Sequence, residues 1–179
     1  MSIESADALL SGYRRFREGH WAEAKAEYEA LAAEGQRPHT LVVACSDSRA
    51  DPALIFDTAP GQLFVVRNVA NLVPPYEPDG RLHGVSAALE FGVKVLGVSR
   101  IVVMGHAHCG GVNAMLNGTP DNCRDFVAPW VGAAVGTGDD QGVRSLASGG
   151  EGLVLGLGLG PMALAEAAVA GEKRVGGFV

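Results

Sequence analysis

Apolar residues form short continuous runs through the middle of the chain, and amphipathic segments separate these runs. The apolar runs are rich in Val and Ile, and they predict strands over residues 39–46, 62–71 and 99–107. Continuous apolar runs, as opposed to alternating ones, are typical of strands that are buried on both faces. The segments between them predict helices or turns over residues 50–61, 83–97 and 110–118. Strands that alternate with helices predict an α/β fold, with a central, mostly parallel sheet flanked by helices and right-handed crossovers.

The two ends of the chain differ from this middle part. Residues 1–35 predict an N-terminal helical arm of two amphipathic helices, 5–19 and 20–35, and we expect the arm to pack on a neighbouring molecule. Residues 36–131 form the predicted α/β core. Residues 132–179 are rich in glycine and have no firm period, so we expect an atypical segment of the same domain there.

Composition narrows the class of protein and its partners. The chain has 179 residues, of which 47% are hydrophobic, and this is enough for one globular domain with its own core. The net charge is −6 and no block of Lys or Arg interrupts the sequence, which argues against nucleic acid and anionic membranes as partners. The N-terminus lacks the pattern of a secretory signal, and three cysteines do not make a disulfide framework. We therefore expect a cytoplasmic protein.

Candidate metal ligands follow two of the predicted strands. Cys45 ends the first strand, while His106 ends the third and Cys109 follows closely. The carboxyl ends of parallel strands meet at one edge of a sheet, where ligands gather. Two cysteines and one histidine make a zinc ligand set that leaves one coordination position open, as in catalytic sites. A single buried cysteine is more often a packing residue, but two ligand-bearing strand ends together favour a metal site.

Several stretches around these residues resemble the β-class carbonic anhydrases. They are CSDSR at residues 45–49, GQLFVVRNVAN at 61–71, and GVSAALEFGVKVLGVSRIVVMGHAHCGG at 84–111. The resemblance covers residues 36–131 and is specific, because five chemically unusual positions fit together. It implies a zinc enzyme that hydrates CO₂ reversibly to bicarbonate and a proton, and that forms a homodimer or higher homo-oligomer.

The resemblance also implies roles for individual residues. Cys45, His106 and Cys109 would bind Zn²⁺. Asp47 would accept a hydrogen bond from zinc-bound hydroxide, and Arg49 would hold Asp47 ionised and oriented. The substrate pocket would be formed by four residues. They are Gln36, donated across a dimer interface, and the wall residues Phe64, Val69 and Phe91.

Four alternatives stay open at this point. Asp47 and Arg49 could be an ordinary surface ion pair, which contributes little to stability. Asp47 could instead displace water from zinc in a closed state, as in some members of the family. The protein could also hydrolyse a CO₂-like molecule such as carbon disulfide on the same fold, or be an inactive zinc-binding relative, because the family's last strand is not recognisable in residues 132–179.

Overall fold

The computed structural model describes residues 5–133 and 154–158. The chain divides into two compact units, Met1–Gln36 and Arg37–Val179, and each is considered by itself below. Most of the predicted segment 132–179 lies outside the described residues. Among the helices within the described ranges, none has the length and apolar character that crossing a membrane would require.

The first unit consists of three helices, α1 (Ala6–Glu18), α2 (His20–Glu23) and α3 (Lys25–Glu34). The side chain of Ser5 accepts a hydrogen bond from the backbone N–H of Ala8 and caps α1, as the sequence predicts. The second predicted helix is interrupted at Ala24, whose φ of −96° and ψ of 18° are not helical. No residue of the three helices is buried, so the described part of this unit, residues 5–36, has no core of its own.

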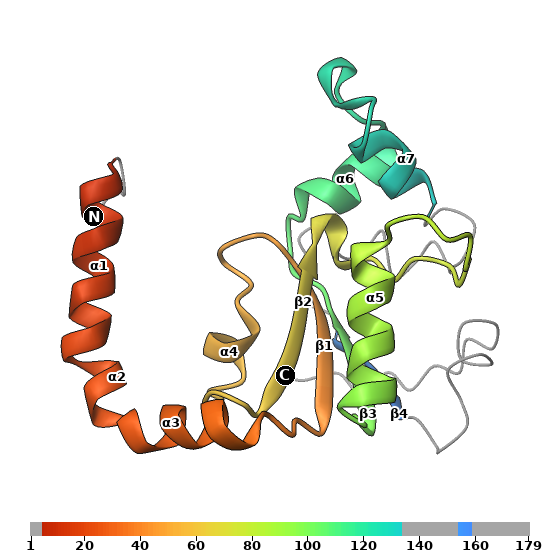
Figure 1. Ribbon diagram of the computed structural model, residues 1–179. Helices are drawn as coiled ribbons and strands as arrows, with labels where there is room; N and C mark the ends of the chain where they lie inside the picture. The colour runs from red at the N-terminus through yellow and green to blue at the C-terminus, as the bar shows by residue number, and fades with distance from the viewer. Residues whose placement is uncertain (1–4, 134–153, 159–179) are drawn as a thin grey trace. The chain divides into compact units, whose positions relative to one another are not determined.

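The second unit is built on a four-stranded sheet (Figure 1). Strands β1 (Thr40–Cys45), β2 (Leu63–Asn68) and β3 (Arg100–Met104) are parallel, and they match the three predicted strands. The strand order is β2-β1-β3-β4, so β1 lies in the interior of the sheet and β2 at its edge.

Strand β4 (Val154–Gly158) pairs antiparallel with β3 and was not predicted from the sequence. It comes from the glycine-rich segment, which has no clear hydrophobic period. Pairing with β3 needs only main-chain N–H and C=O groups, and glycine supplies these as any other residue does. The sheet is therefore mostly parallel, with one antiparallel strand at the edge opposite β2.

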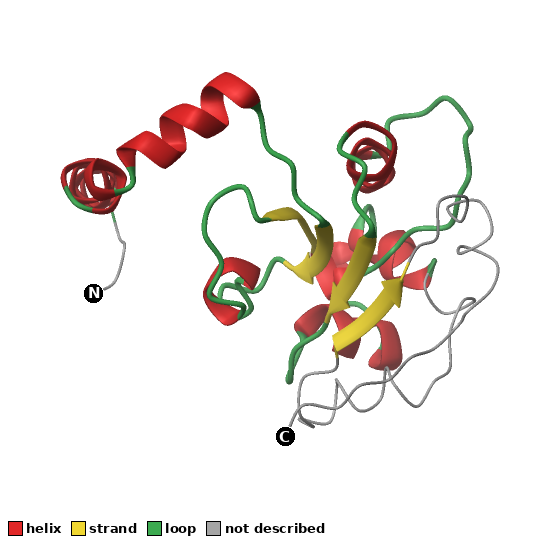
Figure 2. Ribbon diagram, turned by 90° about the horizontal axis from the view of Figure 1, so that it is seen from below, coloured by secondary structure: helices red, strands yellow, loops and turns green. Residues whose placement is uncertain are grey.

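The helices of this unit lie beside the strands or beyond one end of the sheet, as Figures 1 and 2 show. Their bounds are α4 Pro52–Ile55, α5 Gly84–Glu90, α6 Gly110–Asn117 and α7 Val127–Gly132, with 3₁₀ turns at Val69–Asn71 and Asp121–Cys123. Helix α5 continues into one π-helical turn, Phe91–Val95. Sequence periodicity predicts a single helix there and gives no sign of the change in winding.

The core lies on both faces of β1, as the continuous apolar run predicts. Leu41 and Val43 pack with residues of α5 and its π-helical turn on one face. Val42 and Ala44 pack with Ala50 and Met104 on the other face. Because both faces of β1 are filled, its main chain is firmly held, and the strand delivers its last residue, Cys45, to a fixed place at the carboxyl edge of the sheet.

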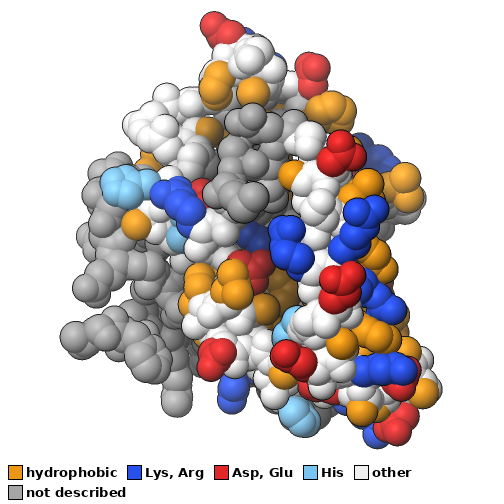
Figure 3. All heavy atoms as spheres, turned by 90° about the vertical axis from the view of Figure 1, so that its left-hand side faces the viewer, with side chains coloured by type: hydrophobic (Ala, Val, Ile, Leu, Met, Phe, Trp, Pro, Cys, Tyr) orange, Lys and Arg blue, Asp and Glu red, His pale blue; other side chains and the backbone are white. Residues whose placement is uncertain are grey.

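Charged groups on the surface are mixed in sign. On the face shown in Figure 3, Lys and Arg side chains lie among Asp and Glu side chains. Exposed ion pairs among the described residues include Lys25 with Glu29 and Lys94 with Glu90. Pairs of this exposed kind contribute little to stability.

Candidate metal centre

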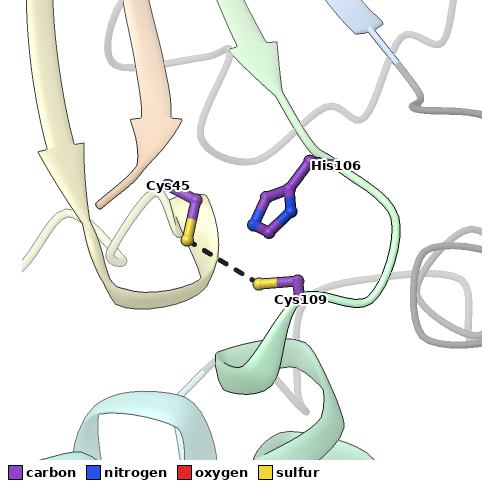
Figure 4. Close-up of side chains that lie close together, drawn as sticks. All are labelled: Cys45, His106 and Cys109. Atoms are coloured by element: carbon purple, nitrogen blue, oxygen red, sulfur yellow. Dashed lines mark hydrogen bonds between the residues drawn. The ribbon is translucent and has the colours of Figure 1, made fainter. Parts of the chain in front are cut away.

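Three side chains meet at the carboxyl edge of the sheet (Figure 4). Cys45 is the last residue of β1, His106 lies two residues beyond the end of β3, and Cys109 immediately precedes α6. One ligand atom from each residue lies within 4.8 Å of the others. The parallel pairing of β1 with β3 brings these residues together, as the sequence predicts.

The two thiols form a hydrogen-bonded pair. The Sγ atoms of Cys45 and Cys109 are 3.7 Å apart, and both side chains are buried. The hydrogen bond from the Cys109 thiol lowers the pKa of Cys45 to about 4. The same hydrogen bond, together with burial, raises the pKa of Cys109. The pair therefore holds one proton near neutral pH, and a soft cation that replaces this proton would satisfy both sulfurs.

His106 offers its second nitrogen to the same space. Its Nδ1 lies 3.0 Å from the carbonyl oxygen of Ala107, and a carbonyl can only accept, so Nδ1 carries the proton. Nε2 is then left with its lone pair. Nε2 is buried and has no hydrogen-bond partner. Buried polar atoms rarely stay unpaired, and a metal ion between the sulfurs and Nε2 would account for this one.

Asp47 and Arg49 are held together beside this group. Arg49 donates from Nε to Oδ1 of Asp47 at 3.0 Å and from Nη2 to Oδ2 at 2.8 Å. The backbone N–H of Arg49 also donates to Oδ1, at 2.9 Å. These contacts hold the pKa of Asp47 well below its usual range. The Oδ2 atom lies 3.9 Å from Nε2 of His106, so the carboxylate faces the candidate metal ligands.

Arg67 is a residue of this site to which the sequence pattern assigns no role. It lies on β2 and donates from Nε to the carbonyl oxygen of Cys45 at 2.9 Å and from Nη2 to that of Asp47 at 2.6 Å. Nη1 donates to Oδ2 of Asp51 at 2.8 Å. An arginine in a strand of mostly apolar residues is a weak sign that its side chain makes hydrogen bonds within the protein. The sequence does not show which groups accept these hydrogen bonds.

The predicted pocket residues are only partly brought together. Phe64 packs against the core, and its ring centroid lies 5.9 Å from that of Phe91. Val69 lies next to Ala70, which packs against Cys45 and Cys109. Gln36 is exposed and is the last residue of the N-terminal unit, so its role stays a prediction.

The turn at Val69–Asn71, which packs against Cys45 and Cys109 through Ala70, has an unusual backbone conformation. Ala70 and Asn71 have φ values of 67° and 47°, a region that residues other than glycine seldom adopt. Trp130 of α7 donates from Nε1 to the carbonyl oxygen of Val69 at 2.8 Å. A Cβ atom at Gly111 would lie 2.8 Å from the Cβ of Ala70. The strained turn is thus clamped between α7 and the start of α6.

Comparison with known proteins gives a consistent answer. A family model described as Carbonic anhydrase matches residues 40–145. A carbonic anhydrase of Synechocystis sp. is 41% identical over 108 residues, which are 60% of this chain and 38% of that protein. Beta carbonic anhydrase 3 of Arabidopsis thaliana is 35% identical over 132 residues, 72% of this chain and 50% of that protein.

Solved structures agree with this. The β-carbonic anhydrase CcaA superposes with a TM-score of 0.67 at 34% identity, over 78% of this chain and 59% of that chain. The Coccomyxa β-carbonic anhydrase, solved in complex with acetazolamide, has a TM-score of 0.63 at 28% identity, over 79% of this chain and 61% of that one.

A mostly parallel sheet with a Cys–His–Cys group at the carboxyl edge of its parallel strands defines an α/β protein with a candidate metal centre. The family model covers more than half of the chain, so the protein belongs to the carbonic anhydrase family, and its relatives are of the β class. The chain spans half or less of the length of the curated relatives described above.

Proposed function

We propose that this protein hydrates CO₂ reversibly to bicarbonate and a proton, with zinc as its cofactor. The observation that carries the proposal is the convergence of Cys45, His106 and Cys109 beside the Asp47–Arg49 pair. Membership of the carbonic anhydrase family supports the reaction, and the unpaired Nε2 of His106 supports the metal.

Zinc suits this donor set. Cys45 and Cys109 would bind it as thiolates, and His106 would bind it through Nε2. Bound there, zinc supplies an acidified water as the nucleophile for CO₂. Two thiolates balance the charge of the metal and make it a weaker Lewis acid than a centre of three histidines, so neighbouring groups must assist. Both thiols must be reduced to bind metal, which favours a reducing compartment such as the cytoplasm.

Asp47 is the group that assists. Its lowered pKa keeps the carboxylate ionised, so it can only accept a hydrogen bond. Arg49 engages both carboxylate oxygens and fixes their direction towards His106 Nε2. An acceptor held in this way would orient the hydroxyl group that attacks CO₂ once zinc is bound. The bidentate contact and the neighbouring ligands argue against an ordinary surface ion pair.

The substrate side of the proposal rests on apolar residues. CO₂ is small and apolar, and we assign Phe64, Val69 and Phe91 to the wall of its pocket. Gln36 would supply the polar anchor from a second copy of the chain. The exposed apolar side chains Leu9, Leu10, Tyr13 and Phe16 of α1 fit a homodimer or higher homo-oligomer, in which they would be covered. One solved relative is described as tetrameric.

The test is CO₂ hydration by stopped flow, with zinc content measured in the same sample. We expect about one zinc per chain, turnover well above buffer and inhibition by acetazolamide. Asp47→Asn keeps the shape of the side chain and should retain zinc while turnover falls at least about tenfold. Asp125→Asn, an exposed aspartate, is the matched control and should behave as wild type.

Three results would contradict the proposal in whole or in part. Bound zinc without turnover in the wild-type protein would indicate an inactive relative, or a site that Asp47 closes by binding the metal. Normal turnover of Asp47→Asn would remove the assigned role of the carboxylate while leaving the reaction in place. Turnover of carbon disulfide but not of CO₂ would assign the same centre to a different substrate.

A further inference from the structure

The guanidinium of Arg67 contacts the main chain on both sides of Ser46. Its Nε and Nη2 atoms donate to the carbonyl oxygens of Cys45 and Asp47, at 2.9 and 2.6 Å. These two residues carry the first candidate metal ligand and the carboxylate that faces the metal centre. One side chain from a neighbouring strand therefore fixes the main chain of both residues.

The sheet register explains how Arg67 reaches them. Arg67 of β2 lies opposite Ala44 of β1, one residue before β1 ends. Beyond Cys45 the chain leaves the sheet, although the N–H of Ser46 still donates to the carbonyl oxygen of Asn68. A guanidinium presents five N–H donors in a rigid plane. It can therefore donate to two carbonyl groups at the point where the chain leaves the hydrogen-bonded sheet.

Asp51 fixes the remaining side of the guanidinium. Its Oδ2 accepts from Nη1 of Arg67 at 2.8 Å, while its Oδ1 accepts from the N–H groups of Ala53 and Leu54 at the start of α4. Arg67 is thus held between the end of β1 and the beginning of α4. Its side chain is 27% exposed, compared with 61% for Arg49.

The two arginines act on different parts of the same segment. Arg49 binds the carboxylate of Asp47 and sets its direction. Arg67 has no contact with that carboxylate among the hydrogen bonds of the described residues, and binds only main-chain oxygens there. The position of Cys45 relative to Asp47 depends on the main chain between them, which Arg67 constrains.

We infer that Arg67 is a positioning residue, which holds the thiolate of Cys45 and the carboxylate of Asp47 in the relative arrangement that the metal centre requires. This inference rests on the proposed function. It assigns to Arg67 no contact with metal or substrate. Groups that orient metal ligands from outside typically change metal affinity or activity 10–100-fold when they are removed, so roughly that effect is expected here.

The experiment compares Arg67→Lys and Asp51→Ser with the wild-type protein. Lysine keeps the positive charge but cannot engage two carbonyl groups and Asp51 in one plane. Serine at position 51 can still cap α4 but leaves Nη1 of Arg67 without its carboxylate. Arg100→Gln changes an exposed arginine at the opposite end of the sheet and serves as control. For each protein we would measure folding, kcat, KM and the rate of zinc transfer to a chromophoric chelator.

The expected result for Arg67→Lys is a folded protein that releases zinc roughly 10–100-fold faster and has a lower kcat at an unchanged KM. Asp51→Ser should show a smaller change in the same direction, and Arg100→Gln none. Unchanged zinc release in folded Arg67→Lys would overturn the inference. If Arg67→Lys does not fold, unchanged zinc release in Asp51→Ser would overturn it, whereas accelerated release would support it.

Zinc release also separates this inference from the proposed function. If the wild-type protein binds zinc without hydrating CO₂, the proposed function fails, but the release rates still decide whether Arg67 positions the ligand segment. If the wild-type protein is active and the Arg67→Lys protein releases zinc and turns over like it, only the inference about Arg67 fails.

Discussion

The thiol sulfurs of Cys45 and Cys109 lie 3.7 Å apart, although 64 positions separate the two residues in the chain. The parallel pairing of β1 with β3, followed by the tight turn into α6, brings them together. The hydrogen bond between the sulfurs lowers the pKa of Cys45 and raises that of Cys109, which favours a pair with one thiolate near neutral pH, a state that suits a soft cation.

This shared proton predicts how many protons zinc displaces. The hydrogen bond between the thiols lowers the pKa of Cys45 and raises that of Cys109, so the pair as a whole should keep one proton at pH 7.5. Zinc binding should therefore release about one proton from the two thiols, where two unperturbed thiols would release nearly two. Calorimetric titration in buffers of different ionisation enthalpy measures this number. A value near two would show that the sulfurs titrate independently.

Removing either sulfur ligand should abolish tight zinc binding. Cys45→Ser and Cys109→Ser each replace a thiolate with a hydroxyl group, which is a poor zinc ligand, so we expect affinity to fall more than about 100-fold. Cys123→Ser is the matched control, because Cys123 is the remaining cysteine and is not part of the ligand group. Zinc per chain after dialysis against a weak chelator measures the effect. Zinc retention in Cys109→Ser would contradict the assigned ligand set.

Gly111 allows the start of α6 to lie against the strained turn at Val69–Asn71. A Cβ atom there would meet the Cβ of Ala70 and Cγ1 of Val69, each at 2.8 Å. We expect Gly111→Ala to lower the free energy of unfolding by about 1–3 kcal/mol through overpacking, and to weaken zinc binding by displacing Cys109.

Gly110→Ala is the control for this prediction. A Cβ atom at Gly110 meets nothing within 4 Å, so the substitution should be neutral or slightly stabilising. Urea denaturation of both variants measures the difference. Equal stability of the two would show that the turn moves aside without penalty.

Trp130 should stabilise the same turn through one hydrogen bond. Its Nε1 donates to the carbonyl oxygen of Val69 at 2.8 Å, and Trp130→Phe removes the donor while keeping most of the ring. The expected loss is about 1 kcal/mol in the free energy of unfolding, with a smaller loss of turnover. Trp21→Phe changes the tryptophan of the N-terminal unit, and should leave the unfolding of the α/β unit unchanged. A similar loss in both variants would contradict this role.

Most of the sheet and the ligand group could be predicted from the sequence. Continuous apolar runs mark β1, β2 and β3, of which β1 is buried almost throughout while β2 and β3 are partly buried, and that pattern is local. Cys45, His106 and Cys109 could be grouped because parallel strands end at one edge. The other features of the fold and the site depend on contacts between distant parts of the chain, which a local sequence pattern does not reveal. Strand β4 is specified by main-chain pairing with β3, and its glycine-rich sequence has no strand signature.

Arg67 shows the same limit at the level of a single side chain. The sequence places it on a strand next to Asn68, but its task follows from the register that sets it opposite Ala44. The left-handed conformation of Ala70 and Asn71 is also set by tertiary contacts, since neither residue type favours it as glycine does. The role of Gln36 and the C-terminal part of the predicted segment 132–179 stay predictions.

The central place of β1 in the sheet has a consequence for how the protein is made. A ribosome delivers Cys45 early, together with Asp47 and Arg67, yet His106 and Cys109 emerge only after the whole crossover that carries α5. Until then the first thiol has no partner sulfur and no imidazole beside it. A nascent chain therefore cannot complete its ligand group until β3 has inserted beside β1. During biosynthesis, metal binding should therefore become possible only when β3 has paired with β1. A chain whose synthesis pauses before β3 would expose the Cys45 thiol to oxidation.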